Sequence, residues 1–283
     1  MGWLRGSRWA LAASILVGAG CAALRQPRPE ERIVAARGLS LRALSASEGG
    51  KWEEAKALFE EALETCSIDV QTRRRYAEAL WEHGDRQAAL TQMHEAVRLS
   101  AHTPALLVAY GRMLLETDQV NEAHRVCRQA VERAPQMADA LALLGDIYLS
   151  QGKLEDAIEV YHRALRVQPE FPPVRLAIAR IDLLRGRPLR CLATLSELQR
   201  DLPQGREPDE ALWLAGLALK SLGRYHDAVE RFAALEQRGV GGAELGRELA
   251  DALWRAGEHE AAQEVAARYG TSEVAGTPDV QRR

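Results

Sequence analysis

The chain has 283 residues, enough for one large or two ordinary domains, and its 47% hydrophobic content excludes an intrinsically disordered protein. Its 37 lysines and arginines are interspersed with 40 aspartates and glutamates, which gives a net charge of −3. Because no strongly positive field results, nucleic acid is not expected as a partner.

The N-terminal segment has the pattern of an export signal. Residues 1–8 contain Arg5 and Arg8 and no acidic residue, and residues 9–19 are apolar. This run is short of the roughly 20 residues that a helix needs to cross a bilayer. The letters GAGCAA at residues 18–23 fit a dinucleotide-binding turn formally, but two prolines follow where that fold requires a helix. The segment therefore predicts export.

A cysteine directly follows three small residues in this segment. Gly18, Ala19 and Gly20 precede Cys21, and this arrangement resembles a bacterial lipoprotein signal. The resemblance implies that residues 1–20 are removed as a signal peptide, that Cys21 is lipidated, and that residues 21–35 form a tether. Gly18 replaces the usual leucine, so secretion to the periplasm without lipid, or an uncleaved anchor, is an alternative. Alanine rather than aspartate after the cysteine favours the outer membrane.

A glycine recurs through the rest of the chain at an almost constant spacing. It occupies six of seven slots, Gly50, Gly84, Gly152, Gly186, Gly223 and Gly257, with Asp118 in the seventh. The steps are 34 residues apart from one of 37, and a fixed period of this kind indicates a repeat architecture. Small residues lie seven positions before and five positions after each slot. We therefore predict that each unit consists of two closely packed helices joined by a tight turn.

The unit at residues 138–171 resembles the tetratricopeptide repeat (TPR). The matching positions are Leu141, Leu144, Gly145, Tyr148, Gly152, Ala157, Tyr161, Ala164 and Pro169. The resemblance implies an all-α fold, a right-handed superhelix of about seven helical hairpins. The expected solenoid covers residues 36–270, with units at 36–69, 70–103, 104–137, 138–171, 172–205, 209–242 and 243–270. Residues 271–283 lack apolar periodicity and are expected to form a mobile tail.

The last three units depart from the pattern. Leu198, Leu235 and Tyr269 replace an alanine that is present in the first four units, and three extra residues lie around Glu207 and Pro208. We expect less regular packing there.

The sequence contains no recognisable catalytic or metal-binding motif. GxSxG, HExxH, P-loop, EF-hand and CxxC patterns are all absent. His124 and Cys127 stand three residues apart, but without a second pair nearby we predict a packed thiol and a solvent-exposed imidazole. Cys66 and Cys191 also fall on inward-facing positions, which predicts free buried thiols. We expect no enzymatic activity, no cofactor, no metal and no small-molecule substrate.

The TPR resemblance implies that the first helices of the units form a concave groove for an extended peptide or a helix of another protein. The residues expected to line this groove are Arg74, Trp81, Val108, Arg112, Leu115, Leu149, Leu176, Arg180, Leu183, Trp213 and Trp254. Tryptophans are common anchors at interfaces, and arginines can pair with carboxylates in a bidentate manner. Packing between neighbouring helices is the alternative for the apolar members.

These features together predict a non-catalytic scaffold of the bacterial cell envelope. The layout is similar to lipoproteins that assist outer-membrane or pilus and secretion assemblies. A recruiting subunit of an envelope enzyme, such as a protease or a glycosyltransferase, is the alternative. A cochaperone that grips a C-terminal carboxylate is disfavoured, because Asn121, the only asparagine, lies in a predicted turn.

Overall fold

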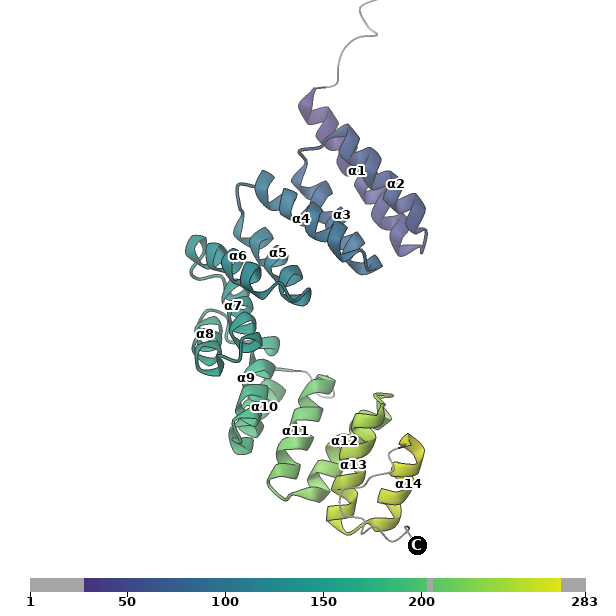
Figure 1. The fold of residues 1–283 in the computed structure, drawn as a ribbon, viewed down its shortest axis with the longest axis vertical. Coiled ribbons are helices and arrows are strands. Elements are labelled where there is room, and N and C mark those ends of the chain that lie inside the picture. Colours follow the sequence, from purple (N-terminus) through teal and green to yellow (C-terminus); the bar gives the residue numbers. More distant parts are fainter. Residues whose placement is uncertain (1–27, 203–205, 271–283) are drawn as a thin grey trace, which may run out of the picture. The chain divides into compact units, whose positions relative to one another are not determined.

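The computed structural model describes residues 28–202 and 206–270, and within them it contains α-helices and no strand (Figure 1). The helices are α1 (Pro29–Glu48), α2 (Trp52–Thr65), α3 (Val70–His83), α4 (Arg86–Leu99), α5 (Pro104–Glu116), α6 (Val120–Arg133), α7 (Ala138–Ser150), α8 (Leu154–Val167), α9 (Pro172–Leu184), α10 (Pro188–Asp201), α11 (Asp209–Ser221), α12 (Tyr225–Gln237), α13 (Ala243–Ala256) and α14 (His259–Tyr269). The all-α fold is confirmed.

The helices fall into two compact units, divided within α5. Unit 1 ends at Leu106 and unit 2 begins at Leu107. In unit 1, α1 packs on α2 and α3 packs on α4. In unit 2, α7 packs on α8, α9 on α10, α11 on α12, and α13 on α14. Consecutive helices therefore pair as hairpins, as the glycine period predicts.

Helix α1 begins at Pro29, earlier than the residue 36 at which the first repeat is expected to start. Proline at the first helical position already has the required φ, and Glu30 and Glu31 favour the positive end of the helix. The Glu31 carboxylate also accepts the backbone N–H of Arg28 at 3.1 Å. The tether expected at residues 21–35 is thus helical from Pro29 onwards.

Asp69 joins the two hairpins of unit 1. Its carboxylate accepts the backbone N–H and the hydroxyl of Thr72 at 2.9 and 2.8 Å, which caps α3, and it pairs with Arg37 of α1 at 3.0 Å. Burial alone would raise the pKa of Asp69, but the hydrogen bonds from Arg37 and Thr72 hold it below its usual range. This stabilisation is present at neutral pH and is lost as the pH falls below about 4 and through the lowered pKa.

Glycine in the first helix of a hairpin accommodates an aromatic ring from the second helix. A Cβ atom on Gly145 of α7 would lie 2.4 Å from the ring of Tyr161 in α8. A Cβ on Gly216 of α11 would lie 2.4 Å from the ring of Phe232 in α12. At these two positions the small residue predicted before the turn makes room for a side chain, rather than for the close approach of two backbones.

Three cysteines are buried free thiols, as predicted: Cys66, Cys127 and Cys191. Burial, together with the charge of Asp146, raises the pKa of Cys127 to about 12. Burial and the nearby Asp182 raise the pKa of Cys191 to about 11. Both groups stay protonated and unreactive at neutral pH.

His124 differs from its prediction, since the structure places it half-buried rather than in solvent. Its ring lies against Tyr148, with 5.7 Å between the ring centroids, because α6 packs on α7. Burial lowers the pKa of His124, and the charge of Arg128 adds to this effect. Across residues 28–202 and 206–270, the His, Cys, Asp and Glu side chains form no cluster of three or more suited to a metal.

Candidate partner-binding face

The predicted groove residues of unit 2 lie on the first helices of its hairpins. We call the set with at least partial exposure the first-helix face: Arg112 and Leu115 on α5; Asp146 and Leu149 on α7; Leu176, Arg180 and Leu183 on α9; Trp213 and Lys220 on α11; and Trp254 on α13. Asp146 and Lys220 join the predicted residues in this face because they occupy the same repeat positions.

Electrostatic interactions connect the first three helices of this face. Burial raises the pKa of Asp146, while the hydrogen bond donated by the Tyr161 hydroxyl at 2.6 Å acts against that rise. The positive charges of Arg112 and Arg180 act in the same direction as the hydrogen bond. One half-buried carboxyl on α7 is therefore flanked by exposed guanidinium groups from α5 and α9.

Ion pairs continue this connection to α11 and α13. Arg180 pairs with Glu210 at the start of α11. Lys220, near the end of α11, contacts Asp251 of α13 at 2.9 Å, and Asp251 also binds Arg255 at 2.9 Å. Burial would raise the pKa of Asp251, but the hydrogen bonds from Arg255 and Lys220 lower it. Ion pairs of Arg180 and Lys220, two residues of the face, thus connect α9 with α11 and α11 with α13.

Apolar side chains accompany these charges. Leu149 is half-buried, and Leu176 and Leu183 are half-buried against the core of the α9–α11 region. Partly exposed apolar side chains beside charged ones can bind an amphipathic segment, because the segment buries its apolar residues there and keeps its polar groups paired.

Trp213 borders an open pocket of about 290 Å³ between α11 and the start of α13. Its ring also packs on Phe232, with 5.5 Å between the centroids. The Trp254 ring packs on the His259 ring in a similar manner, with 4.3 Å between the ring centroids. Both tryptophans pack against the core of the last two hairpins, so each combines a structural role with partial exposure.

Three other predicted groove residues do not join this face. Arg74 and Trp81 belong to α3 in unit 1, where Arg74 pairs with Glu78 at 3.4 Å and Trp81 stacks under the Arg86 guanidinium at 3.9 Å. Val108 is only 6% exposed, so we leave it out of the proposed binding surface. Cys21, the predicted lipid site, lies outside the described residues.

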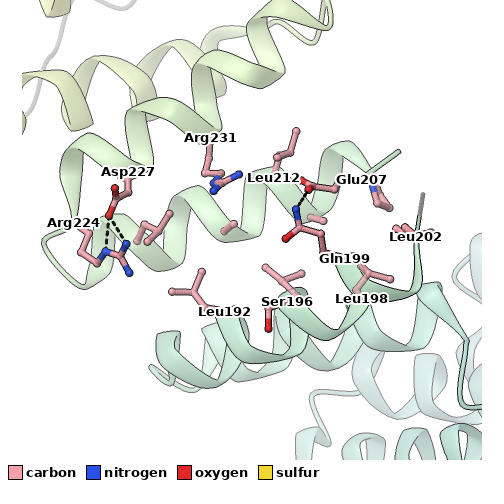
Figure 2. A pocket seen from close by; sticks show the side chains of 15 residues that line it. Leu192, Ser196, Leu198, Gln199, Leu202, Glu207, Leu212, Arg224, Asp227 and Arg231 are labelled. Atoms are coloured by element: carbon pink, nitrogen blue, oxygen red, sulfur yellow. Dashed lines mark hydrogen bonds and ion pairs between the residues drawn. The ribbon is translucent and has the colours of Figure 1, made fainter. Parts of the chain in front are cut away.

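One pocket was not anticipated from the sequence. It measures about 260 Å³ and lies between α10, α11 and α12, with Leu192, Leu195 and Leu212 among its apolar lining (Figure 2). It coincides with the 37-residue step of the repeat and with Leu198, which occupies a slot that holds alanine in the first four units. Those two departures from the repeat were the sequence signal that could have predicted the pocket, because a larger side chain and a longer connection can move neighbouring hairpins apart.

Successive helical hairpins, packed on one another within each unit, define an α-helical repeat protein, and no catalytic constellation is visible in the described part of the chain. A family model described as tetratricopeptide repeat matches residues 40–102, 111–173 and 205–272, and a second model of the same description matches residues 148–218. These matches cover more than half of the chain, which belongs to the tetratricopeptide repeat family.

Curated relatives match the chain over part of their length. Interferon-induced protein with tetratricopeptide repeats 3 of Mus musculus is 30% identical over 120 residues, which cover 41% of this chain and 30% of the mouse protein. Anaphase-promoting complex subunit 7 of Arabidopsis thaliana is 25% identical over 158 residues, which cover 43% of this chain and 28% of that protein. The chain thus spans less than a third of either relative.

Two solved structures share the fold at low sequence identity. PilF of Pseudomonas aeruginosa aligns with a TM-score of 0.62 at 19% identity, covering 76% of this chain and 96% of that one. PilW, a widely conserved type IV pilus biogenesis factor, aligns with a TM-score of 0.64 at 21% identity, covering 77% of this chain and 98% of that one.

Within residues 28–202 and 206–270, every helix is too short or too polar to cross a membrane.

Proposed function

We propose that this chain is a non-catalytic protein-interaction scaffold of the bacterial cell envelope. It binds an extended peptide or a helix of a partner along the first-helix face. The observation that carries this proposal is the set of side-chain interactions that connect α5, α7 and α9, α9 with α11, and α11 with α13, beside leucines and unburied charges. Repeat proteins use such extended surfaces for binding, because each unit adds contacts to the same partner.

The envelope location rests on the N-terminal segment. A positive start, a short apolar run and small residues before Cys21 favour export and lipid attachment there. Two or more acyl chains suffice for stable anchoring. The likeness to PilF and PilW, which concerns the fold, is in keeping with a role in the assembly of an outer-membrane or pilus complex.

Introduction of negative charge into the apolar part of the face tests the binding surface. We expect the double substitution Leu149→Asp and Leu183→Asp to reduce partner recovery in affinity capture more than tenfold, because removing a central anchor costs roughly 2 kcal/mol or more. Leu189→Asp is the matched control: Leu189 is 69% exposed on α10, a second helix, and its substitution should leave recovery unchanged. Equal recovery with the double variant would contradict the proposal.

Metabolic labelling with a fatty acid tests the anchor. The native chain should incorporate label and remain with membranes, whereas Cys21→Ser should lose the label and become soluble in the periplasm, because serine lacks the acceptor thiol. Equal labelling of the two proteins would show that Cys21 is not the attachment site.

A further inference from the structure

The pocket between α10, α11 and α12 lies apart from the first-helix face. Its floor is apolar and is formed by Leu192 and Leu195 of α10 and by Leu212, Ala215 and Leu219 of α11. An engineered cavity of roughly 150 Å³ binds benzene, whereas drug-sized ligands occupy pockets of about 300–1,000 Å³. At about 260 Å³, this pocket has room for one large apolar side chain.

Most polar groups around the pocket already have partners. Arg224 pairs with Asp227 at 2.5 Å, and the Gln199 amide donates a hydrogen bond to the Glu207 carboxylate. The Ser196 hydroxyl donates to the backbone carbonyl of Ala193 at 2.9 Å.

Arg231 of α12 is the exception among these groups. It lines the same pocket and forms no hydrogen bond or ion pair with any side chain that the structure describes. Figure 2 shows its guanidinium over α11, between the Arg224–Asp227 pair and the Glu207–Gln199 pair. An apolar floor thus lies beneath an unpaired positive charge.

We infer that this pocket is a second protein-docking site, which takes a leucine-sized or aromatic side chain of a partner segment with an acidic side chain next to it. The apolar side chain fills the floor, and the carboxylate binds the Arg231 guanidinium. Charge complementarity sets this choice, because an Arg–carboxylate pair is geometrically specific and a basic segment would be repelled. The Glu207 carboxylate, held by Gln199, fixes the orientation by excluding a second acid from that end.

A small probe with the same two groups tests this inference. In 4-phenylbutyrate, a phenyl ring and a carboxylate are joined by a short stem, and 4-phenylbutyramide is its uncharged counterpart. At about 0.3 kcal/mol per non-hydrogen atom, the acid should bind the full chain with a Kd on the order of 2 mM. Titration followed through ¹³C-labelled leucine methyl groups should shift Leu192, Leu195 and Leu212. The amide should bind about fivefold more weakly, since it lacks the charged pair.

Three variants assign this binding to its groups. Arg231→Gln should bring the acid and the amide to equal affinity. Arg166→Gln, a change to an exposed arginine on α8, should preserve the fivefold difference. Ser196→Phe adds a ring at the exposed rim and should weaken both probes without disturbing the core, which unchanged thermal unfolding would verify.

Several results would overturn the inference. One is the absence of methyl shifts at about 20 mM probe, tenfold above the expected Kd, as would follow if the chain's own residues or a second copy filled the pocket. A second is that the largest methyl shifts lie outside α10–α12. A third is that Arg231→Gln still binds the acid more tightly than the amide by the same factor.

Discussion

Replacement of Gly145 by alanine is expected to lower the free energy of unfolding of unit 2 by about 2 kcal/mol. The new methyl group would lie 2.4 Å from the ring of Tyr161, which is completely buried and held by a hydrogen bond to Asp146. Overpacking of this kind destabilises a protein by up to about 3 kcal/mol, and the better helix propensity of alanine offsets about 1 kcal/mol of that loss. Urea denaturation followed by circular dichroism measures the difference.

The same substitution at Gly38 is the matched control. Gly38 lies in the middle of α1, and a Cβ atom there would meet nothing within 4 Å. Gly38→Ala should therefore raise the stability of unit 1 by about 0.5–1 kcal/mol. If Gly145→Ala also stabilised the protein, that result would contradict the close contact between Gly145 of α7 and the Tyr161 ring of α8.

Replacement of Tyr161 by phenylalanine is expected to cost about 2 kcal/mol at pH 7, because Asp146 would lose its hydrogen bond while remaining buried. Tyr148→Phe is the control: this half-buried tyrosine of the same helix pair has ring contacts, but its hydroxyl forms no hydrogen bond with the described residues, so we expect a change within about 0.5 kcal/mol.

The cost of Tyr161→Phe should depend on pH. Burial raises the pKa of Asp146 in the folded chain, so the folded state retains a proton more strongly than the unfolded state does, and this group lowers stability as the pH rises from about 4. Loss of the Tyr161 hydroxyl raises that pKa further. The difference between native and variant should shrink towards about 1 kcal/mol as the pH falls below about 4, because the carboxyl becomes protonated and only a neutral hydrogen bond is then lost. A difference that grows on acidification would contradict this assignment.

The repeat period made the helix pairs predictable. Turn glycines and apolar positions are local properties of the sequence, so they indicate where each helix begins and ends. The period could not indicate that a large residue in one helix of a unit is accommodated by a small residue in the other helix. Tyr269 departs from the alanine of earlier units, and the structure places its Cβ 2.4 Å from where a Cβ on Gly246 would lie. Gly246 makes room for Tyr269, a pairing that becomes visible only when both helices are in place.

The candidate face was only partly predictable. Repeat positions place Arg112 and Arg180 on first helices, but the half-buried position of Asp146 between them, with its hydrogen bond from Tyr161, depends on the packing of three helices. Burial of Val108 and the division within α5 also arise from packing. Arg231 was missed because it lies on a second helix, where the family pattern places no ligand.

The structure also changes how the face is best tested. Trp213 and Trp254 pack against the core of the last two hairpins, so their truncation to alanine would weaken folding as well as binding. Leu149 and Leu183 are smaller probes, and because Leu183 also packs against the core of the α9–α11 region, unchanged thermal unfolding is the required check that their variant still folds.

Site-specific photo-crosslinking in the native cells tests the central claim most directly. A photoreactive amino acid is placed at Leu149 or Leu183 on the first-helix face, and at Glu159 of α8 or Leu189 of α10 on second helices. We predict that one partner protein is captured from both first-helix positions and from neither second-helix position. Capture of that partner from Glu159 or Leu189, with none from Leu149 and Leu183, would contradict the proposal that the first-helix face binds the partner.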